Sequence, residues 1–173
     1  MTVESSTLPL ILTLKLARPA FERFDALRRA HFPPERNLIP AHLTLFHALP
    51  GEQFGPIYHK LAEVSAASPA VPLRFPAPRS LGRGVAIVVE APALITLRGW
   101  LAAAWAGWLS AQDRQGYRPH ITVQNKVAPE QARRLYAELA AAWVPCESTG
   151  DGLLLWRYLG GPWKLLEEFR FAG

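Results

Sequence analysis

The stretch AHLTLFHALPGEQ (residues 41–53) predicts a β-strand, a turn and the start of a helix. Polar His42 and Thr44 alternate with apolar Leu43 and Leu45, which is the pattern of a strand with one buried face. If both faces of the sheet were buried, both faces of this strand would ordinarily carry apolar residues. The imidazole and the hydroxyl therefore mark one face of this strand as a candidate site.

The same pattern returns 78 residues later in PHITVQNKVAPEQ (residues 119–131). At this constant offset His120 corresponds to His42, and Thr122 corresponds to Thr44. Apolar residues again separate them, and further identities continue without a gap into the following helix. Several identities in one ungapped register indicate a duplicated strand–turn–helix unit.

The remaining segments alternate in a similar order in both halves. Strands are expected at residues 8–16, 71–75 and 84–90, and helices at residues 19–31, 52–66, 94–109 and 129–142. The proline-rich stretch at residues 76–84 is expected to be a loop, and the last twenty residues predict a hairpin turning at Gly160-Gly161-Pro162. Because no long linker separates the halves, we expect residues 1–173 to form a single bilobal domain.

Composition limits the class of protein. The chain has 173 residues, of which 50% are hydrophobic, so it can bury a sizeable core. Its formal net charge of +5 favours acidic partners such as phosphates or RNA. The single Cys146 cannot form an internal disulfide, which fits a reducing compartment. Without a stretch of transmembrane length, we expect a soluble, cytoplasmic and monomeric protein with no membrane partner.

The two motifs support a specific chemistry if the halves pack so that their polar faces meet across a groove. In-line displacement at a phosphodiester needs one proton removed from the attacking oxygen and one delivered to the leaving oxygen. His42 and His120 can divide these roles near neutral pH. Thr44 and Thr122 can donate hydrogen bonds to the non-bridging oxygens. The sequence lacks the carboxylate cluster of a two-metal nuclease, so neither a metal nor another cofactor is expected.

Neighbouring residues supply further candidates. Alternation along the strand places Phe46 on the motif face and His47 on the opposite, helix-covered face, where it would have no catalytic role. Tyr117 and Phe46 could stack a nucleobase, although packing in the core or at the rim is an equal alternative. Arg118 shares the face of His120 and could reach phosphate, and a surface cation is the alternative.

The HLTL and HITV motifs resemble the paired His-x-Thr-x motifs of the 2H phosphoesterase superfamily, especially its bacterial 2′-5′ RNA ligase-like (LigT-type) cyclic phosphodiesterases. The stretch RPHITV, the aromatic-rich hairpin and the duplication add to the resemblance. It implies a bilobal α+β fold with a pseudo-two-fold axis, two antiparallel sheets facing a central groove, and helices outside. It also implies that His42, Thr44, His120 and Thr122 line the groove.

The predicted function is therefore a metal-independent cyclic phosphodiesterase. Members of the family open 2′,3′-cyclic phosphates or related cyclic nucleotides, and some join RNA ends through 2′-5′ linkages. The expected partner is a cyclic nucleotide or an RNA terminus. An RNA-end-binding module with little chemistry is the alternative. The sequence leaves open whether hydrolysis or ligation prevails, and which histidine is the acid.

Overall fold

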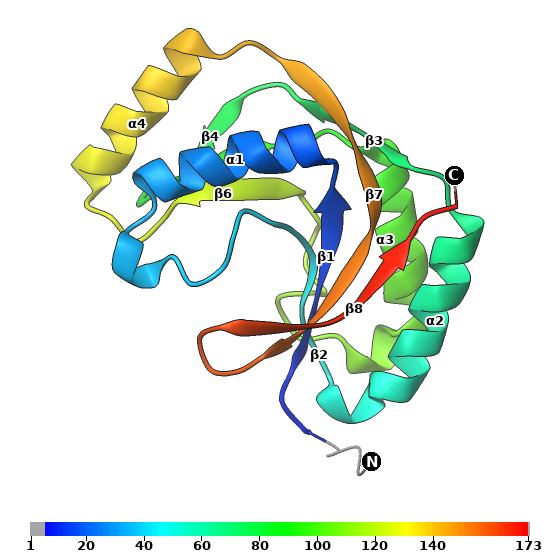
Figure 1. Cartoon of the computed structure of the whole chain (residues 1–173). Helices are drawn as coiled ribbons and strands as arrows, with labels where there is room; N and C mark the ends of the chain where they lie inside the picture. The colour runs from blue at the N-terminus through cyan, green and yellow to red at the C-terminus, as the bar shows by residue number, and fades with distance from the viewer. Residues whose placement is uncertain (1–5, 173) are drawn as a thin grey trace.

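The computed structural model of the chain describes residues 6–172 (Figure 1). Its strands are β1 (Leu10–Leu16), β2 (Leu43–Leu49), β3 (Val71–Phe75), β4 (Pro78–Ser80), β5 (Val85–Val88), β6 (His120–Gln124), β7 (Cys146–Tyr158) and β8 (Trp163–Arg170). Its α-helices are α1 (Arg18–His31), α2 (Phe54–Ala67), α3 (Pro92–Ala104) and α4 (Pro129–Ala142). No helix within residues 6–172 is both long enough and apolar enough to span a membrane.

Four α-helices lie close to the four expected segments, but α3 starts at Pro92 and ends at Ala104 instead of spanning residues 94–109. Proline occupies the first turn of α1, α3 and α4, where its missing N–H group is not needed for a helical hydrogen bond. The buried face of α1 consists of Ala20, Phe24 and Arg28, spaced by four residues. This helix packs against β6, while α2 packs against β8 and α4 packs against β4. The helices therefore link strands of both halves of the chain.

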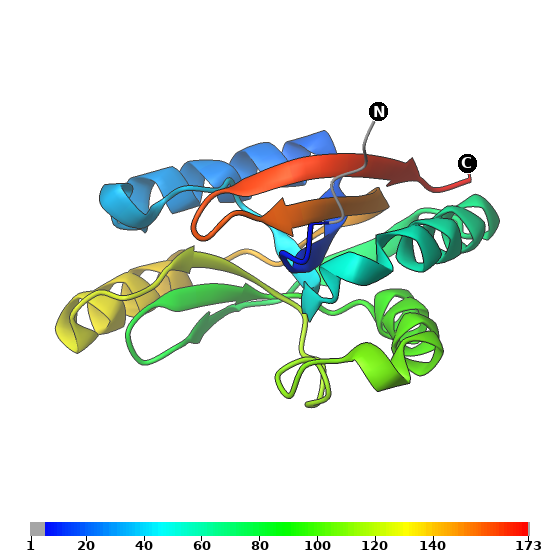
Figure 2. The same ribbon diagram turned by 90° about the horizontal axis from the view of Figure 1, so that it is seen from below.

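The strands form one antiparallel sheet in the order β3-β7-β1-β2-β6-β5-β4, and β8 pairs with β7. The α+β class is confirmed, but the expectation of two separate sheets is wrong. A single register pair, Leu43 with Ile121, joins β2 to β6 at the centre of the sheet. Without this pairing, β2 and β6 would both be edge strands with unpaired backbone N–H and C=O groups at the middle of the molecule. The two halves diverge from this junction (Figure 2).

The sheet also curls strongly, so that its two ends approach each other. Strands β3 and β4 lie at opposite ends of the strand order, yet only residues 76 and 77 separate them in the chain. Arg74 and Glu90 exchange backbone hydrogen bonds of 3.0 and 2.8 Å, which connect β3 to the segment after β5. The stretch expected to be a proline-rich loop thus contains the short strand β4. The chain passes directly from β3, at one end of the strand order, to β4, at the other end.

Each motif strand contains a β-bulge directly after its threonine. In the β1–β2 ladder the register shifts between the Thr44 pair and the Phe46 pair. In the β5–β6 ladder it shifts between the Thr122 pair and the Gln124 pair. A side chain at position 84 would place its Cβ 2.0 Å from the Gln124 carbonyl oxygen, so the approach of β5 to the second bulge requires Gly84. A bulge reverses which face the following side chains occupy.

Candidate active site

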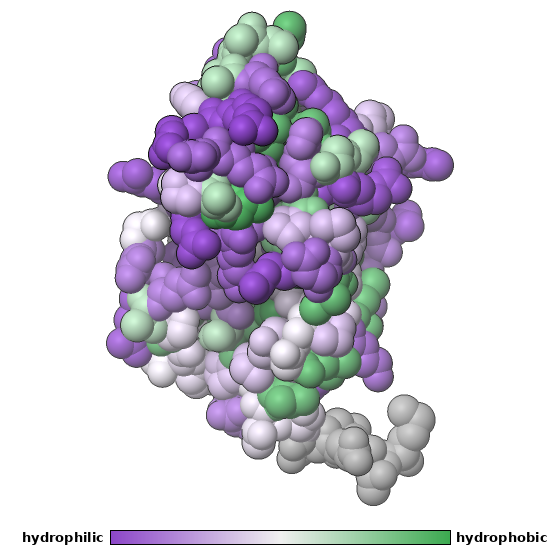
Figure 3. Space-filling model, turned by 90° about the vertical axis from the view of Figure 1, so that its left-hand side faces the viewer, coloured by the Kyte–Doolittle hydropathy of each residue, from purple (hydrophilic) through white to green (hydrophobic). Residues whose placement is uncertain are grey.

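A groove with a cavity volume of about 610 Å³ lies between the two halves of the sheet. The four predicted motif side chains line it together: His42, Thr44, His120 and Thr122. Further walls come from β4, α3 and the segment that joins α3 to β6. One side of the molecule is shown by hydropathy in Figure 3, and hydrophilic residues predominate on that side.

The central strand pair explains why these side chains converge. Leu43 of β2 faces Ile121 of β6, and both are fully buried beneath the sheet. His42 and Thr44 flank Leu43 in the chain, and His120 and Thr122 flank Ile121. Side chains next to a buried pair point to the other face of the sheet. The four motif side chains therefore converge on the groove from both sides of the central strand pair.

Both motif histidines have the same hydrogen bond on one ring nitrogen. Nδ1 of His42 lies 3.0 Å from the Pro40 carbonyl oxygen, and Nδ1 of His120 lies 2.8 Å from the Arg118 carbonyl oxygen. The two carbonyl positions are also 78 residues apart. Since a carbonyl only accepts, Nδ1 of each ring donates, and Nε2 is the acceptor of the neutral ring. Such a ring is set to take a proton at Nε2.

Burial lowers the pKa of His42 from 6.5 to about 4, against a smaller opposing effect of the bond to Pro40. Nearby positive charge, on Arg28 above all, contributes to this lowered pKa. Burial also lowers the pKa of His120, with Arg79 and His47 adding to the effect. Both rings are therefore neutral in the empty groove at pH 7, and an anion bound between them would favour their protonation.

Phe46 lies in the core and not in the groove, contrary to the expectation from alternation. Its side chain is fully buried. Its ring contacts Trp105 edge-to-face at 5.3 Å, and the Arg98 guanidinium lies 4.4 Å from its centroid. The cause is the bulge after Thr44, which directs two successive side chains, Leu45 and Phe46, into the core. Phe46 is therefore excluded from contact with a substrate.

His47 lies in the groove, so the prediction that it faces the helices is also wrong. The same bulge turns it to the face of Thr44, and its side chain is 42% exposed. Its Nδ1 lies 3.0 Å from Oδ1 of Asp113, a carboxylate that the sequence analysis missed. The backbone N–H groups of His47 and Ala48 donate to the same carboxylate. The groove thus contains a third imidazole, oriented by a buried acid.

Asp113 is ionised in this arrangement. Burial by itself would raise its pKa, but hydrogen bonds from His47 and Ala48 outweigh burial and hold the pKa of Asp113 below its usual range. The sequence carried one signal of this geometry. Two consecutive core residues, Leu45 and Phe46, interrupt the alternation just before His47, as expected for a bulge.

Two buried arginines hold the bulged segments, and the sequence analysis missed both. Arg28 of α1 donates to the Thr122 carbonyl oxygen over 3.0 Å. Arg98 of α3 donates to the carbonyl oxygens of Leu45 and Asp113. Burial lowers the pKa of Arg28 to about 10, so its guanidinium remains charged. A charged residue on a helix ordinarily faces solvent, and sequence alone gives no reason to place these two inside.

A sequence model of the 2′-5′ RNA ligase superfamily matches residues 16–162. The chain belongs to this superfamily. No curated protein matches it. Similar solved structures include TT0787 of Thermus thermophilus (TM-score 0.68, 20% identity, covering 96% of this chain and 99% of that chain). Escherichia coli LigT complexed with 3′-AMP has a TM-score of 0.63 and 20% identity, covering 97% of this chain and all of LigT. A protein described as a phosphoesterase has a TM-score of 0.60 and 20% identity, covering 97% of this chain and all of that chain.

In this superfamily member, Tyr117 supports a motif strand. Its hydroxyl donates to the Thr44 carbonyl oxygen over 2.8 Å, and the Arg98 guanidinium lies 4.9 Å from its ring centroid. Burial raises the pKa of Tyr117, so the hydroxyl keeps its proton. Tyr117 also lines the groove, as does exposed Arg118. The structure thus gives Tyr117 a positioning contact in addition to its place on the groove wall.

The groove of this superfamily member is electrically positive. Arg79, Arg98 and Arg118 line it, and its acid Asp113 is already engaged by His47 and Ala48. A concave surface of this sign concentrates anions such as phosphates. Within residues 6–172, no three His, Cys, Asp or Glu side chains are grouped so that they could hold a metal ion.

The lowered pKa of His42 gives a prediction for folding stability. The unfolded ring has a pKa near 6.5, and the folded ring has a pKa of about 4. Between these values the unfolded chain binds a proton that the folded chain does not, so stability falls as the pH falls from 6.5 towards 4. The full difference is at most about 3 kcal/mol. We expect His42→Gln to lose less stability than wild type between pH 7.5 and 4.5 in urea unfolding. Equal losses would contradict a half-buried ring that stays neutral in the folded protein.

Proposed function

We propose that the chain is a metal-independent cyclic phosphodiesterase that opens 2′,3′-cyclic phosphates of nucleotides or RNA ends. One observation carries the proposal. Two histidines with equivalent Nδ1 hydrogen bonds lie in one positive groove together with both motif threonines, on either side of the Leu43–Ile121 pair that joins β2 to β6. This set supplies a proton acceptor, a proton donor and two hydroxyl donors for the phosphoryl oxygens.

The reaction balances with these groups alone. One neutral histidine takes a proton from water as the water oxygen forms a bond to phosphorus. The bond from phosphorus to one ribose oxygen breaks, and the other histidine, protonated, gives its proton to that oxygen. Thr44 and Thr122 donate to the non-bridging oxygens during the displacement. If a ribose 5′-hydroxyl of RNA replaces water as the nucleophile, the same groove joins two RNA ends through a 2′-5′ linkage.

The related structures support a nucleotide as the ligand. Escherichia coli LigT has been crystallised with 3′-AMP, with ATP, with NADP⁺ and with phosphate. The fold that this chain shares with LigT therefore accommodates nucleotides and phosphate in at least one protein. The net positive groove of the present chain fits the same class of ligand.

The deciding experiment is a screen of nucleoside 2′,3′-cyclic phosphates and of RNA with a cyclic phosphate end, with the product phosphate located at the 2′ or 3′ position. We expect turnover that survives EDTA, because the proposed steps use only histidine and threonine. Loss of turnover in EDTA, restored by one specific metal, would contradict this mechanism. Tight binding of RNA ends without any turnover, unchanged in His42→Ala and His120→Ala, would favour the RNA-end-binding module.

His47 gives a second test of the groove. Its imidazole lies close enough to both motif histidines to influence the pKa of each, and Asp113 fixes its orientation. We expect His47→Ala to lower kcat/KM for a cyclic phosphate by about 10-fold, as for one hydrogen bond to a charged group. His59→Ala, on the exposed face of α2, is the matched control and should change nothing. An unchanged rate in His47→Ala would exclude a role for this ring.

A further inference from the structure

Helix α1 makes one side-chain hydrogen bond to each of the two motif segments. Oδ1 of Asp25 accepts from the backbone N–H group of Ala41 over 2.9 Å, and Ala41 directly precedes His42. Three residues further along the helix, Nη1 of Arg28 donates to the Thr122 carbonyl oxygen over 3.0 Å. Residues three apart lie on the same face of a helix. A single turn of α1 thus links the segment before the first motif to the strand of the second.

The bond to Thr122 comes from a buried guanidinium. Arg28 is 3% exposed, its Nε donates to Oδ1 of Asn37 over 2.9 Å, and its guanidinium carbon lies 3.9 Å from the centroid of the Phe32 ring. Burying a charge is costly, and an apolar side chain would fill the same space without that cost. The distinctive contribution of Arg28 is therefore its hydrogen bonds to the loop before β2 and to β6.

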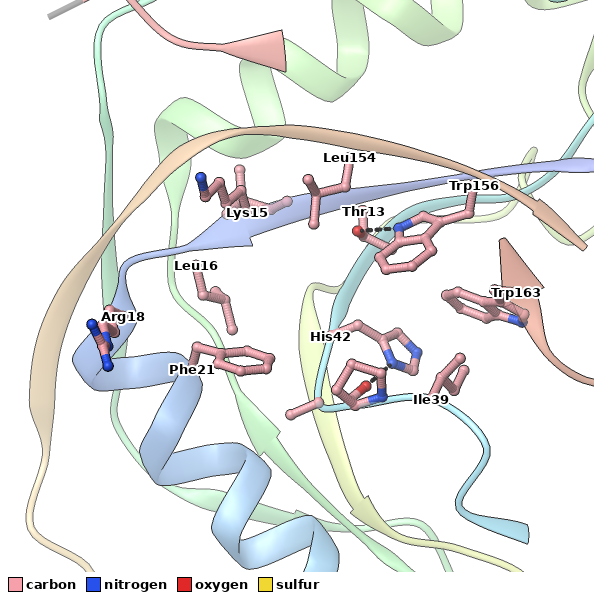
Figure 4. A pocket seen from close by; sticks show the side chains of 13 residues that line it. Thr13, Lys15, Leu16, Arg18, Phe21, Ile39, His42, Leu154, Trp156 and Trp163 are labelled. Atoms are coloured by element: carbon pink, nitrogen blue, oxygen red, sulfur yellow. Dashed lines mark hydrogen bonds between the residues drawn. The ribbon is translucent and has the colours of Figure 1, made fainter. Parts of the chain in front are cut away.

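Neither Asp25 nor Arg28 lines the groove, and neither lines the second cavity beside it. This second cavity, of about 310 Å³, lies between the start of α1 and the first motif, and Figure 4 shows Phe21 and His42 around it. Because a cavity separates the start of α1 from His42, packing from that part of the helix does not hold the ring in place. The backbone bond from Ala41 to Asp25 connects this motif to α1 instead.

The junction that α1 spans is narrow. Strands β2 and β6 share the single register pair Leu43–Ile121, and the two halves of the sheet diverge from it (Figure 2). In the β5–β6 ladder the register shifts directly after the Thr122 pair, and a bulge disrupts strand pairing locally. Contacts outside the ladder must therefore contribute to the angle between the halves, and α1, which follows β1 in the chain, packs against β6.

We propose that α1 is a brace between the two motifs and that Asp25 and Arg28 are its positioning residues. Arg28 fixes Thr122, Asp25 fixes the segment that leads into His42, and the helix between them sets the separation of the two motifs across the groove. The assignment rests on the proposed function, because in-line displacement needs both motifs correctly placed around one phosphate. A misplacement of about 1 Å at such a site can lower the rate by about 10²-fold.

The test replaces Arg28 by methionine, which keeps an unbranched side chain without donors, and by lysine, which keeps the charge. With adenosine 2′,3′-cyclic phosphate we expect Arg28→Met to lower kcat by about 10²-fold with little change in KM, because Arg28 does not contact the substrate. Arg28→Lys should recover part of this loss through one hydrogen bond to Thr122. Arg83→Met is the matched control: Nε of Arg83 donates to the Val127 carbonyl oxygen over 3.2 Å, outside both cavities, so kcat should be unchanged.

Double variants separate positioning from a general loss of stability. If Arg28 acts through Thr122, Arg28→Met combined with Thr122→Val should cost less in kcat than the product of the two single losses. Asp25→Ala, which removes the acceptor of the Ala41 N–H group, should also lower kcat and be non-additive with Arg28→Met. If Arg28→Met does not fold in urea-unfolding controls, Arg28→Lys replaces it in both cycles. Multiplicative losses, a loss carried by KM, or full activity in the Arg28 variants would each overturn the brace.

Amide hydrogen exchange, measured residue by residue, tests the brace without turnover. If wild type opens no cyclic phosphate, the proposed function fails and this measurement alone decides. Asp25→Ala should speed exchange in β6 as well as at Ala41, and Arg28→Met should speed it at residues 41–43 as well as in β6, because the two bonds act through one helix. Arg83→Met should leave both segments unchanged. Faster exchange only at the direct partner of each substituted residue would show two independent bonds and would overturn the brace.

Discussion

Replacing His42 or His120 by alanine should lower kcat/KM for a 2′,3′-cyclic phosphate by about 10²–10⁴-fold, the usual contribution of general acid–base catalysis. Each ring lies in the groove with Nδ1 bound to a carbonyl oxygen. The double variant should lose less than the product of the two single losses, because residues that act as a unit are not additive. Steady-state kinetics on the three variants, with urea unfolding to verify their folding, gives the measurement.

The pH profile and the leaving group separate the two roles. The profile of kcat/KM should be bell-shaped, because the base must be neutral and the acid charged. Since burial lowers the pKa of both rings, we expect its maximum on the acid side of pH 6.5. With a 4-nitrophenyl phosphodiester, whose leaving group needs no proton, the variant without the acid should regain activity and the variant without the base should not. Recovery in neither variant would contradict the division of labour.

Replacing Thr44 or Thr122 by valine should lower kcat by roughly 10²-fold, the effect of losing one hydrogen bond made in the transition state. Valine keeps the shape and the strand preference of threonine, so the hydroxyl is the principal loss. The carbonyl groups of both residues are held by other side chains, Tyr117 and Arg28, which the substitution leaves in place. The measurement is kcat and KM for one cyclic phosphate with each variant.

The threonine experiment has a close control on the same protein. Thr96 is exposed on α3 and lies outside the groove, so Thr96→Val should retain full activity. A rise in KM with an unchanged kcat in the motif variants would show that the hydroxyls bind the ground state and the transition state equally. That result would remove threonine from the catalytic step while leaving it in the binding site.

The motif positions could be found from sequence because they depend on local periodicity. A strand has a two-residue period, so alternation assigned His42 and Thr44 to one face, and the repeat at 78 residues assigned His120 and Thr122 likewise. The hairpin turn at Gly160 followed from turn chemistry in the same way, and Gly160 has the expected positive φ of 91°. Family membership followed from these motifs together.

Alternation failed where a strand stopped being regular. The bulge after Thr44 placed Phe46 in the core and His47 in the groove, the reverse of the prediction. A bulge depends on the partner strand and on what fills the space behind it, here the Arg98 side chain that binds the Leu45 carbonyl oxygen. The consecutive apolar residues Leu45 and Phe46 are the one local sign of the bulge, and neither the partner strand nor Arg98 can be inferred from them.

The family and the positions of the two His-x-Thr motifs were readable from the amino-acid sequence alone. The fold was needed to show that β2 and β6 join one sheet and that Asp113 orients His47. The physical reason is the range of the interactions. Strand and helix periodicity arises within a few residues, whereas Asp113 and His47 are 66 residues apart and Trp163 meets His42 from the far end of the chain. Such contacts form only when the whole core packs.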